Sequence, residues 1–221
     1  LKAGSTFMAK KLSRLDKCVD GILACVQTKP PGDSCLTATG SKCLNAFTAI
    51  ANDEAKLIST VQGKCALTSA GLLGPTGLDE NRLATECGSL VNVDDVATCL
   101  ARQHECRVDE LFDVQQPRSR ELLNFAGVPL APSTCLIDHG GAGAAAGSAD
   151  LGSKIDSCAA AIKKAGRTLA TARLKGLSKC VQAAFACVER QQEDPGCFAA
   201  AGIKCARLRT SIDNATIKLA P

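Results

Sequence analysis

Residues 12–47 read LSRLDKCVDGILACVQTKPPGDSCLTATGSKCLNAF and contain four cysteines in the spacing C-x6-C-x9-C-x7-C. The same spacing returns in residues 174–208, LKGLSKCVQAAFACVERQQEDPGCFAAAGIKCARL. The eight positions are Cys18, Cys25, Cys35, Cys43, Cys180, Cys187, Cys197 and Cys205. Each cysteine of the second set follows its counterpart by 162 positions, and aligning residues 1–59 with 163–221 gives 22 identities without a gap. The chain therefore contains an internal duplication.

Each copy has the pattern of two antiparallel helices. Apolar side chains recur every three or four residues in the first arm, which predicts a helix with one apolar face. They are Leu12, Leu15, Val19, Ile22 and Val26 in the first copy, and Leu174, Leu177, Val181, Ala184 and Val188 in the second. Proline and glycine interrupt both copies, at residues 29–34 and 193–196, and a second helix is expected after each break.

A helical hairpin restricts how its cysteines can pair. The two cysteines of each arm are seven or eight residues apart, so they share one side of their helix and span roughly 10–12 Å along its axis. In an antiparallel hairpin, nested pairs face each other, whereas crossed pairs would have to reach past each other. The predicted disulfides are Cys18–Cys43, Cys25–Cys35, Cys180–Cys205 and Cys187–Cys197.

The composition favours an all-α fold. The 221 residues include no Trp, no Tyr and six Phe, whereas Ala and Leu are abundant, and this balance suits helices better than sheets. We therefore expect duplicated, disulfide-stapled antiparallel helical hairpins with a helical middle segment. The even count of 14 cysteines suggests structural disulfides in a secreted, cell-surface or periplasmic protein. The first residue, Leu1, fits a chain from which a signal peptide has been removed.

The sequence divides into segments of different character. We assign residues 1–66 to the first hairpin repeat, 79–138 to an acidic helical middle segment, 139–152 to a Gly/Ala-rich linker or exposed loop, and 153–221 to the second hairpin repeat. Between the first two, residues 67–80 are predicted to be a loop because they are rich in glycine and contain a proline.

Within the middle segment, short helices are expected. Asn92 or Asp94 can cap a helix that contains Cys99 and Cys106, and Pro117 can start a further short helix. Cys87 can pair with Cys99 across the intervening turn. The sequence does not assign the four remaining cysteines, which are Cys65, Cys106, Cys135 and Cys158.

The charge is unevenly distributed. Residues 79–138 hold eleven acidic and five basic side chains, whereas residues 151–221 hold twelve basic and five acidic ones. Solvated helix faces account for such runs in most proteins. A second interpretation is that the acidic middle and basic flanks attract each other, within one chain or between protein partners or identical copies. Sequence-specific nucleic-acid binding is not expected, and no apolar run reaches the 18 residues that suggest a membrane span.

The sequence offers no competent catalytic or metal-binding set. His104 lies beside Cys99 and Cys106, but these three positions do not share one face of a regular helix, and His139 is expected in a loop. A Cys–His nucleophile would need a free thiolate, which the even cysteine count argues against. No phosphate-binding loop, haem-attachment motif or hydrolase motif is present, so we predict no cofactor and no enzymatic activity.

These features favour a non-enzymatic structural or interaction role, as a subunit of a cell-surface or extracellular assembly. Two alternatives belong to other classes. One is a thiol-rich protein that binds or stores a soft metal ion such as Cu(I). The other is a carrier of a small molecule or lipid in an apolar cavity between helices.

Overall fold

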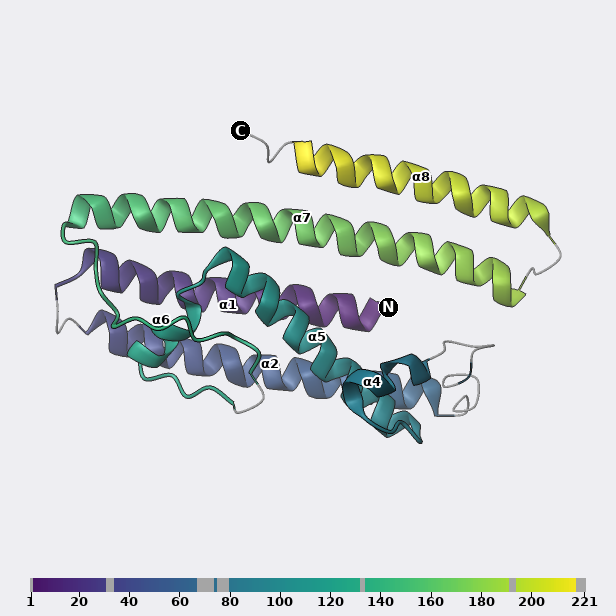
Figure 1. Ribbon diagram of the computed structural model, residues 1–221, viewed down its shortest axis with the longest axis horizontal. Coiled ribbons are helices and arrows are strands. Elements are labelled where there is room, and N and C mark those ends of the chain that lie inside the picture. The colour runs from purple at the N-terminus through teal and green to yellow at the C-terminus, as the bar shows by residue number, and fades with distance from the viewer. Residues whose placement is uncertain are drawn as a thin grey trace.

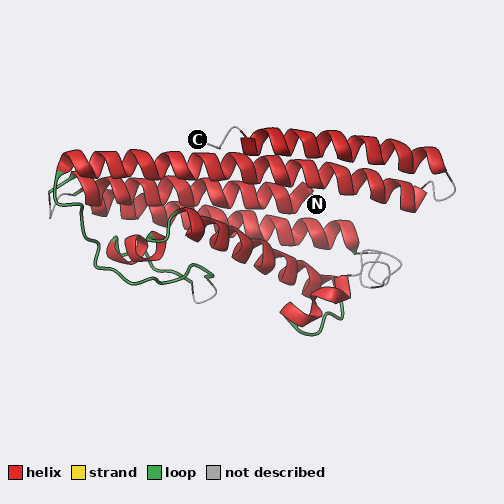
Figure 2. Cartoon of the chain, turned by 45° about the horizontal axis from the view of Figure 1, so that its top comes forward, coloured by secondary structure: helices red, strands yellow, loops and turns green. Residues whose placement is uncertain are grey.

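The computed structural model describes residues 2–30, 34–66, 74, 80–131, 134–190 and 194–217. Across these ranges the chain is helical, with no strand, which confirms the all-α prediction (Figures 1 and 2). The helices are α1 (Lys2–Thr28), α2 (Cys35–Cys65), the 3-10 helix η1 (Glu80–Leu83), α4 (Ala84–Cys87), α5 (Val93–Gln115), α6 (Ser119–Phe125), α7 (Ala149–Arg190) and α8 (Pro195–Ile217). Most of the predicted 67–80 loop lies outside the described residues.

The duplicated segments form two hairpins, α1 with α2 and α7 with α8 (Figure 1). The structure joins the four cysteine pairs that the spacing predicts. The Cα–Cα distances of the outer pairs are 4.9 Å for Cys18–Cys43 and 4.8 Å for Cys180–Cys205. The inner pairs, nearer the turns, both measure 5.7 Å. The two copies therefore share the same spacing and pairing of their helices.

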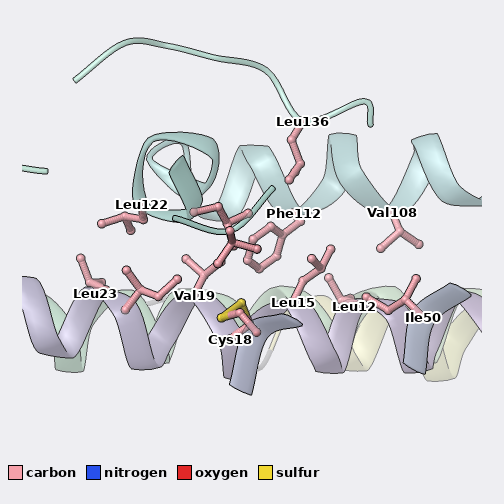
Figure 3. Packing of buried hydrophobic residues seen from close by; sticks show 14 of the residues in the cluster. Leu12, Leu15, Cys18, Val19, Leu23, Ile50, Val108, Phe112, Leu122 and Leu136 are labelled. Carbon is pink, nitrogen blue, oxygen red and sulfur yellow. A yellow bond between two sulfur atoms is a disulfide. The ribbon is translucent and has the colours of Figure 1, made fainter. Parts of the chain in front are cut away.

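Helix α1 is the centre of the fold, because α2, α5, α6 and α7 all pack against it. Its apolar stripe is buried, as the three-and-four spacing predicts. Figure 3 shows Phe112 and Val108 pointing from α5 toward Leu12, Leu15 and Val19 of α1, with Leu122 of α6 beside them. The acidic middle segment thus supplies the apolar side chains that cover the first hairpin.

The middle segment is anchored by caps and disulfides. The Asn92 side chain accepts a hydrogen bond of 2.9 Å from the backbone N–H of Asp95, so Asn92, one of the two predicted caps, is the N-cap of α5. The predicted pair Cys87–Cys99 is joined. A further disulfide, Cys106–Cys135, links α5 to the loop after α6, with a Cα–Cα distance of 5.0 Å.

The Gly/Ala-rich stretch is held to the body of the protein. The backbone N–H of Gly143 donates to Glu121 at 2.8 Å, and that of Ala146 donates to Gln27 at 2.9 Å. Helix α7 then begins at Ala149, three residues before the predicted end of this stretch, and continues as one helix of 42 residues into the second hairpin. Of the predicted linker or loop, residues 139–148 are therefore non-helical and residues 149–152 belong to α7.

Polar side chains join α1 to the first half of α7. Arg167 donates to Asp16 at 3.0 Å, and Lys163, which is buried, forms an ion pair with Asp20. Burial raises the pKa of Asp16 to about 6 from an ordinary value of 3.8, and the positive charges of Arg167 and Lys163 only partly oppose this effect.

This pKa shift predicts a pH-dependent stability. Between about pH 4 and pH 6 the native protein keeps the Asp16 proton that the unfolded chain has already lost, so the free energy of unfolding falls as the pH rises. The expected loss is about 2–3 kcal/mol. Denaturant titrations at about pH 4 and pH 7 should show a loss that is about 2–3 kcal/mol larger in the wild type than in Asp16→Asn, because other carboxyls with shifted pKa values, such as Asp109, contribute equally in both proteins. An identical pH profile in the two proteins would contradict the assignment.

Candidate interaction surface

The two hairpins differ in what covers them. In the first copy Leu15 and Val19 are 1% and 0% exposed, whereas their counterparts Leu177 and Val181 are 57% and 48% exposed. We call this uncovered area the open face. It consists of Leu177, Val181, Phe185 and Val188 of α7 with Phe198 of α8, all of which are exposed. Among the described residues, no helix packs on this area in the way that α5 and α6 pack on the first hairpin (Figure 1).

A groove of about 410 Å³ lies on the second hairpin, beside the Cys180–Cys205 disulfide. Its lining residues include Leu177 and Ile212. In the first copy the corresponding residues, Leu15 and Ile50, belong to the buried core. At Leu177 and Ile212 the groove therefore corresponds to positions that are buried in the first hairpin.

A glycine that both copies share is in close contact with another segment in the first copy only. A Cβ atom at Gly40 in α2 would lie 2.7 Å from the carbonyl oxygen of Ala126, at the end of α6. A Cβ atom at the equivalent Gly202 in α8 would meet nothing within 4 Å. Glycine weakens a helix by about 1 kcal/mol relative to alanine. In the first copy the glycine permits a close backbone contact, whereas in the second copy no contact among the described residues requires a glycine.

The two glycines should therefore respond oppositely to alanine. Gly40→Ala should lower the free energy of unfolding by about 1–3 kcal/mol, because the new methyl group overlaps the Ala126 carbonyl. Gly202→Ala should stabilise α8 by up to about 1 kcal/mol. Denaturant unfolding measures the first effect, and hydrogen exchange of the α8 amides measures the second. Destabilisation by both substitutions would show that Gly202 is also covered in solution.

The charged residues beside the open face also have counterparts in the first copy. Lys11 is buried and forms ion pairs with two residues of α5, Asp109 at 2.7 Å and Glu105 at 3.1 Å. Burial raises the pKa of Asp109, which the Lys11 ammonium group partly opposes. The residue equivalent to Lys11 is Arg173, which is exposed and makes no ion pair with any described residue. Arg209, in the position of Phe47, adds a further positive charge to the lining of the groove.

The histidines that sequence analysis singled out have structural partners. Nδ1 of His104 lies 2.6 Å from the carbonyl oxygen of Leu100, and burial lowers the pKa of His104. Nε2 of His139 lies 2.8 Å from Asp113. Cys99 and Cys106 are both in disulfides, so no thiol of theirs is available to His104. Within the part of the chain that the structure describes, no group of three or more His, Cys, Asp or Glu side chains could hold a metal ion.

A second groove, of about 610 Å³, lies between the start of α1 and the middle of α7. Four lysines line it, together with several hydroxyl groups: Lys2, Lys10, Lys175, Lys179, Ser5, Thr6, Ser13, Thr171 and Ser178. Lys10 also forms an ion pair with Asp53 at 2.8 Å. Sequence analysis missed this groove, because its two walls come from helices whose packing no local pattern predicts.

Comparisons with known proteins do not extend these observations. No protein-family model, curated protein or solved structure matches the chain. Among the described helices, none is both long enough and apolar enough to cross a membrane.

Proposed function

We propose that this protein is a non-enzymatic interaction subunit of an assembly outside the cytoplasm, secreted or held at a cell surface or in a periplasm. In this proposal α1, α2, α5 and α6 form a rigid body, and the second hairpin presents the open face to another protein. The observation that carries the proposal is the exposure of residues whose counterparts form the core of the first copy. Exposed groups of apolar side chains of this kind are typical of interaction sites.

The cysteines support a location in an oxidising compartment. Twelve of the 14 cysteines lie in six disulfides. Disulfides persist in secreted and periplasmic proteins and are rare in a reducing cytosol. The same pairing weighs against the thiol-rich metal protein, since a disulfide sulfur is not a thiolate ligand.

A photo-crosslinking experiment in the source organism tests the proposal. A photoreactive amino acid at Val181, on the open face, should give a discrete cross-linked product from the chain recovered outside the cytoplasm. The control position is Ile203 of α8, which is 56% exposed and corresponds to Ser41, an exposed residue of the first copy. Alkylation before lysis should also leave the six disulfide pairs unmodified. Equal products at both positions, or a fully reduced chain, would refute the proposal.

A second candidate function, transport of a small amphipathic molecule, is favoured by the groove between α1 and α7. Its volume falls within the range of about 300–1,000 Å³ that is usual for ligand pockets. The aliphatic stems of the lysines can contact an apolar chain while their ammonium groups contact an anionic group. Native mass spectrometry of the purified protein should then show a retained ligand that Lys175→Glu releases. A ligand-free spectrum of protein purified from its source would exclude this candidate.

A further inference from the structure

The duplication identifies the kind of partner that fits the open face, because the first copy is a hairpin of the same design with its face already covered. The two hairpins share their cysteine pairing, and their outer disulfides differ by only 0.1 Å in Cα–Cα distance, 4.9 Å against 4.8 Å. They also retain Leu15/Leu177, Val19/Val181 and Val26/Val188 as identical residues. What binds this face in the first copy is therefore a template for what binds it in the second.

In the first copy the covering segment is acidic and amphipathic. It comprises the second half of α5 and the following α6, residues 105–127. The apolar contacts come from Val108 and Phe112 of α5 and from Leu122 of α6 (Figure 3), together with Leu123 of α6. All four residues are buried in the core around α1. Glu105 and Asp109 lie on the same side of α5 and form ion pairs with Lys11. The recognition pattern is thus a carboxylate, a second carboxylate four residues later, and an aromatic residue three residues after that.

The second hairpin keeps the types of residue that contact this covering segment in the first copy. The cation is retained as Arg173, the apolar residues as Leu177 and Val181, and the close-approach glycine as Gly202. Arg173 is exposed without an ion pair among the described residues, and Gly202 faces open space. These positions have the character of a contact surface that no described residue of this chain covers.

We propose that the open face binds an acidic amphipathic helix of a different protein, with an aromatic side chain in the groove beside Cys180–Cys205 and carboxylates on Arg173. This inference rests on the proposed function and specifies the class of protein that binds the open face. A second copy of this chain is a poorer occupant, because residues 151–221 hold twelve basic and five acidic side chains, and two such faces repel each other. The matching acidic segment of a second copy is also already buried against that copy's own first hairpin.

The covering segment itself provides the probe. A synthetic peptide of residues 105–127, with Cys106→Ser to prevent disulfide exchange, should bind the full-length, oxidised protein in calorimetry. We expect Leu177→Glu to weaken binding at least tenfold. Arg173→Glu should weaken it about fivefold and reduce its dependence on salt, because a charge pair is lost. In the peptide, Phe112→Ala should also weaken binding at least tenfold.

Ile203→Glu is the matched control, since it places the same charge on the same hairpin away from the open face, and it should change the affinity less than twofold. All the substituted residues of the protein are exposed, and circular dichroism checks that each variant is folded. Absence of peptide binding, or binding unchanged by Leu177→Glu, would overturn the inference. So would a dimer in sedimentation that Leu177→Glu dissociates, because the occupant would then be a second copy. If the peptide does not bind while Val181 still cross-links to another protein, the proposed function stands and only the partner class is wrong.

Discussion

Leu15→Ala is expected to lower the free energy of unfolding by about 2–5 kcal/mol, whereas Leu177→Ala should change it by less than about 0.5 kcal/mol. The two leucines occupy the same position in the two copies of the repeat. Leu15 is 1% exposed between α1 and α5, so its truncation leaves a cavity, whereas Leu177 is 57% exposed and has little burial to lose. Denaturant unfolding of the two variants and the wild type measures both values.

Val19→Ala and Val181→Ala provide an independent pair at 0% and 48% exposure. The free energy of unfolding should again decrease mainly in Val19→Ala, the substitution in the first copy. Equal destabilisation by Leu15→Ala and Leu177→Ala would show that the open face is covered in solution, by self-association or by rearrangement of the chain. Repeating the measurement at a tenfold lower protein concentration separates these causes, because self-association depends on concentration.

The asymmetry of the hairpins is the feature that sequence patterns could not predict. The three-and-four spacing marks an apolar face on both α1 and α7, and it does so equally well for Leu15 and for Leu177. Periodicity shows which side of a helix is apolar, but the tertiary arrangement decides whether anything packs on that side. Because α5 packs on α1 and α2, the apolar face of the first hairpin is buried, whereas that of the second hairpin is exposed.

The disulfides also differ in whether local sequence patterns predict them. Pairs within a hairpin follow from helix geometry, and Cys87–Cys99 follows from a short turn, so local spacing was sufficient to predict them. Cys106–Cys135 joins α5 to a loop whose path depends on tertiary contacts, including the hydrogen bond of 3.1 Å from the backbone N–H of Cys135 to Asp109. Those contacts leave no periodic signal in the sequence.

Charge gave a partial prediction of the site. The attraction expected between the acidic middle and a basic flank is present within the chain, where Lys11 contacts Glu105 and Asp109. The sequence did not identify Arg173 as the equivalent cation without a partner, because an exposed arginine has the same local pattern as a paired one. Only the alignment of the copies on the structure separates the two.

Removal of the outer disulfide should also act differently in the two copies. Both loops have a sequence separation of 25 residues, so chain entropy alone predicts a loss of about 3–4 kcal/mol for each. In Cys18→Ala/Cys43→Ala this loss should appear as a lower free energy of global unfolding, because α1 and α2 contribute to the main core. A lower denaturant midpoint is the expected result, with a somewhat steeper slope because the unfolded chain is less compact without this disulfide.

In Cys180→Ala/Cys205→Ala the same loss should appear as local opening of α8. This helix packs along α7, and Ala201 is its one buried residue. Little apolar burial therefore holds α8 in place once the Cys180–Cys205 disulfide is removed. Native-state hydrogen exchange should show faster exchange of the α8 amides while α1, α2 and α5 stay protected. Uniformly faster exchange in all helices would instead mean that the second hairpin and the core unfold as one unit. The open face would then be part of the cooperative structure, and a partner helix bound there would stabilise the whole chain rather than α8 alone.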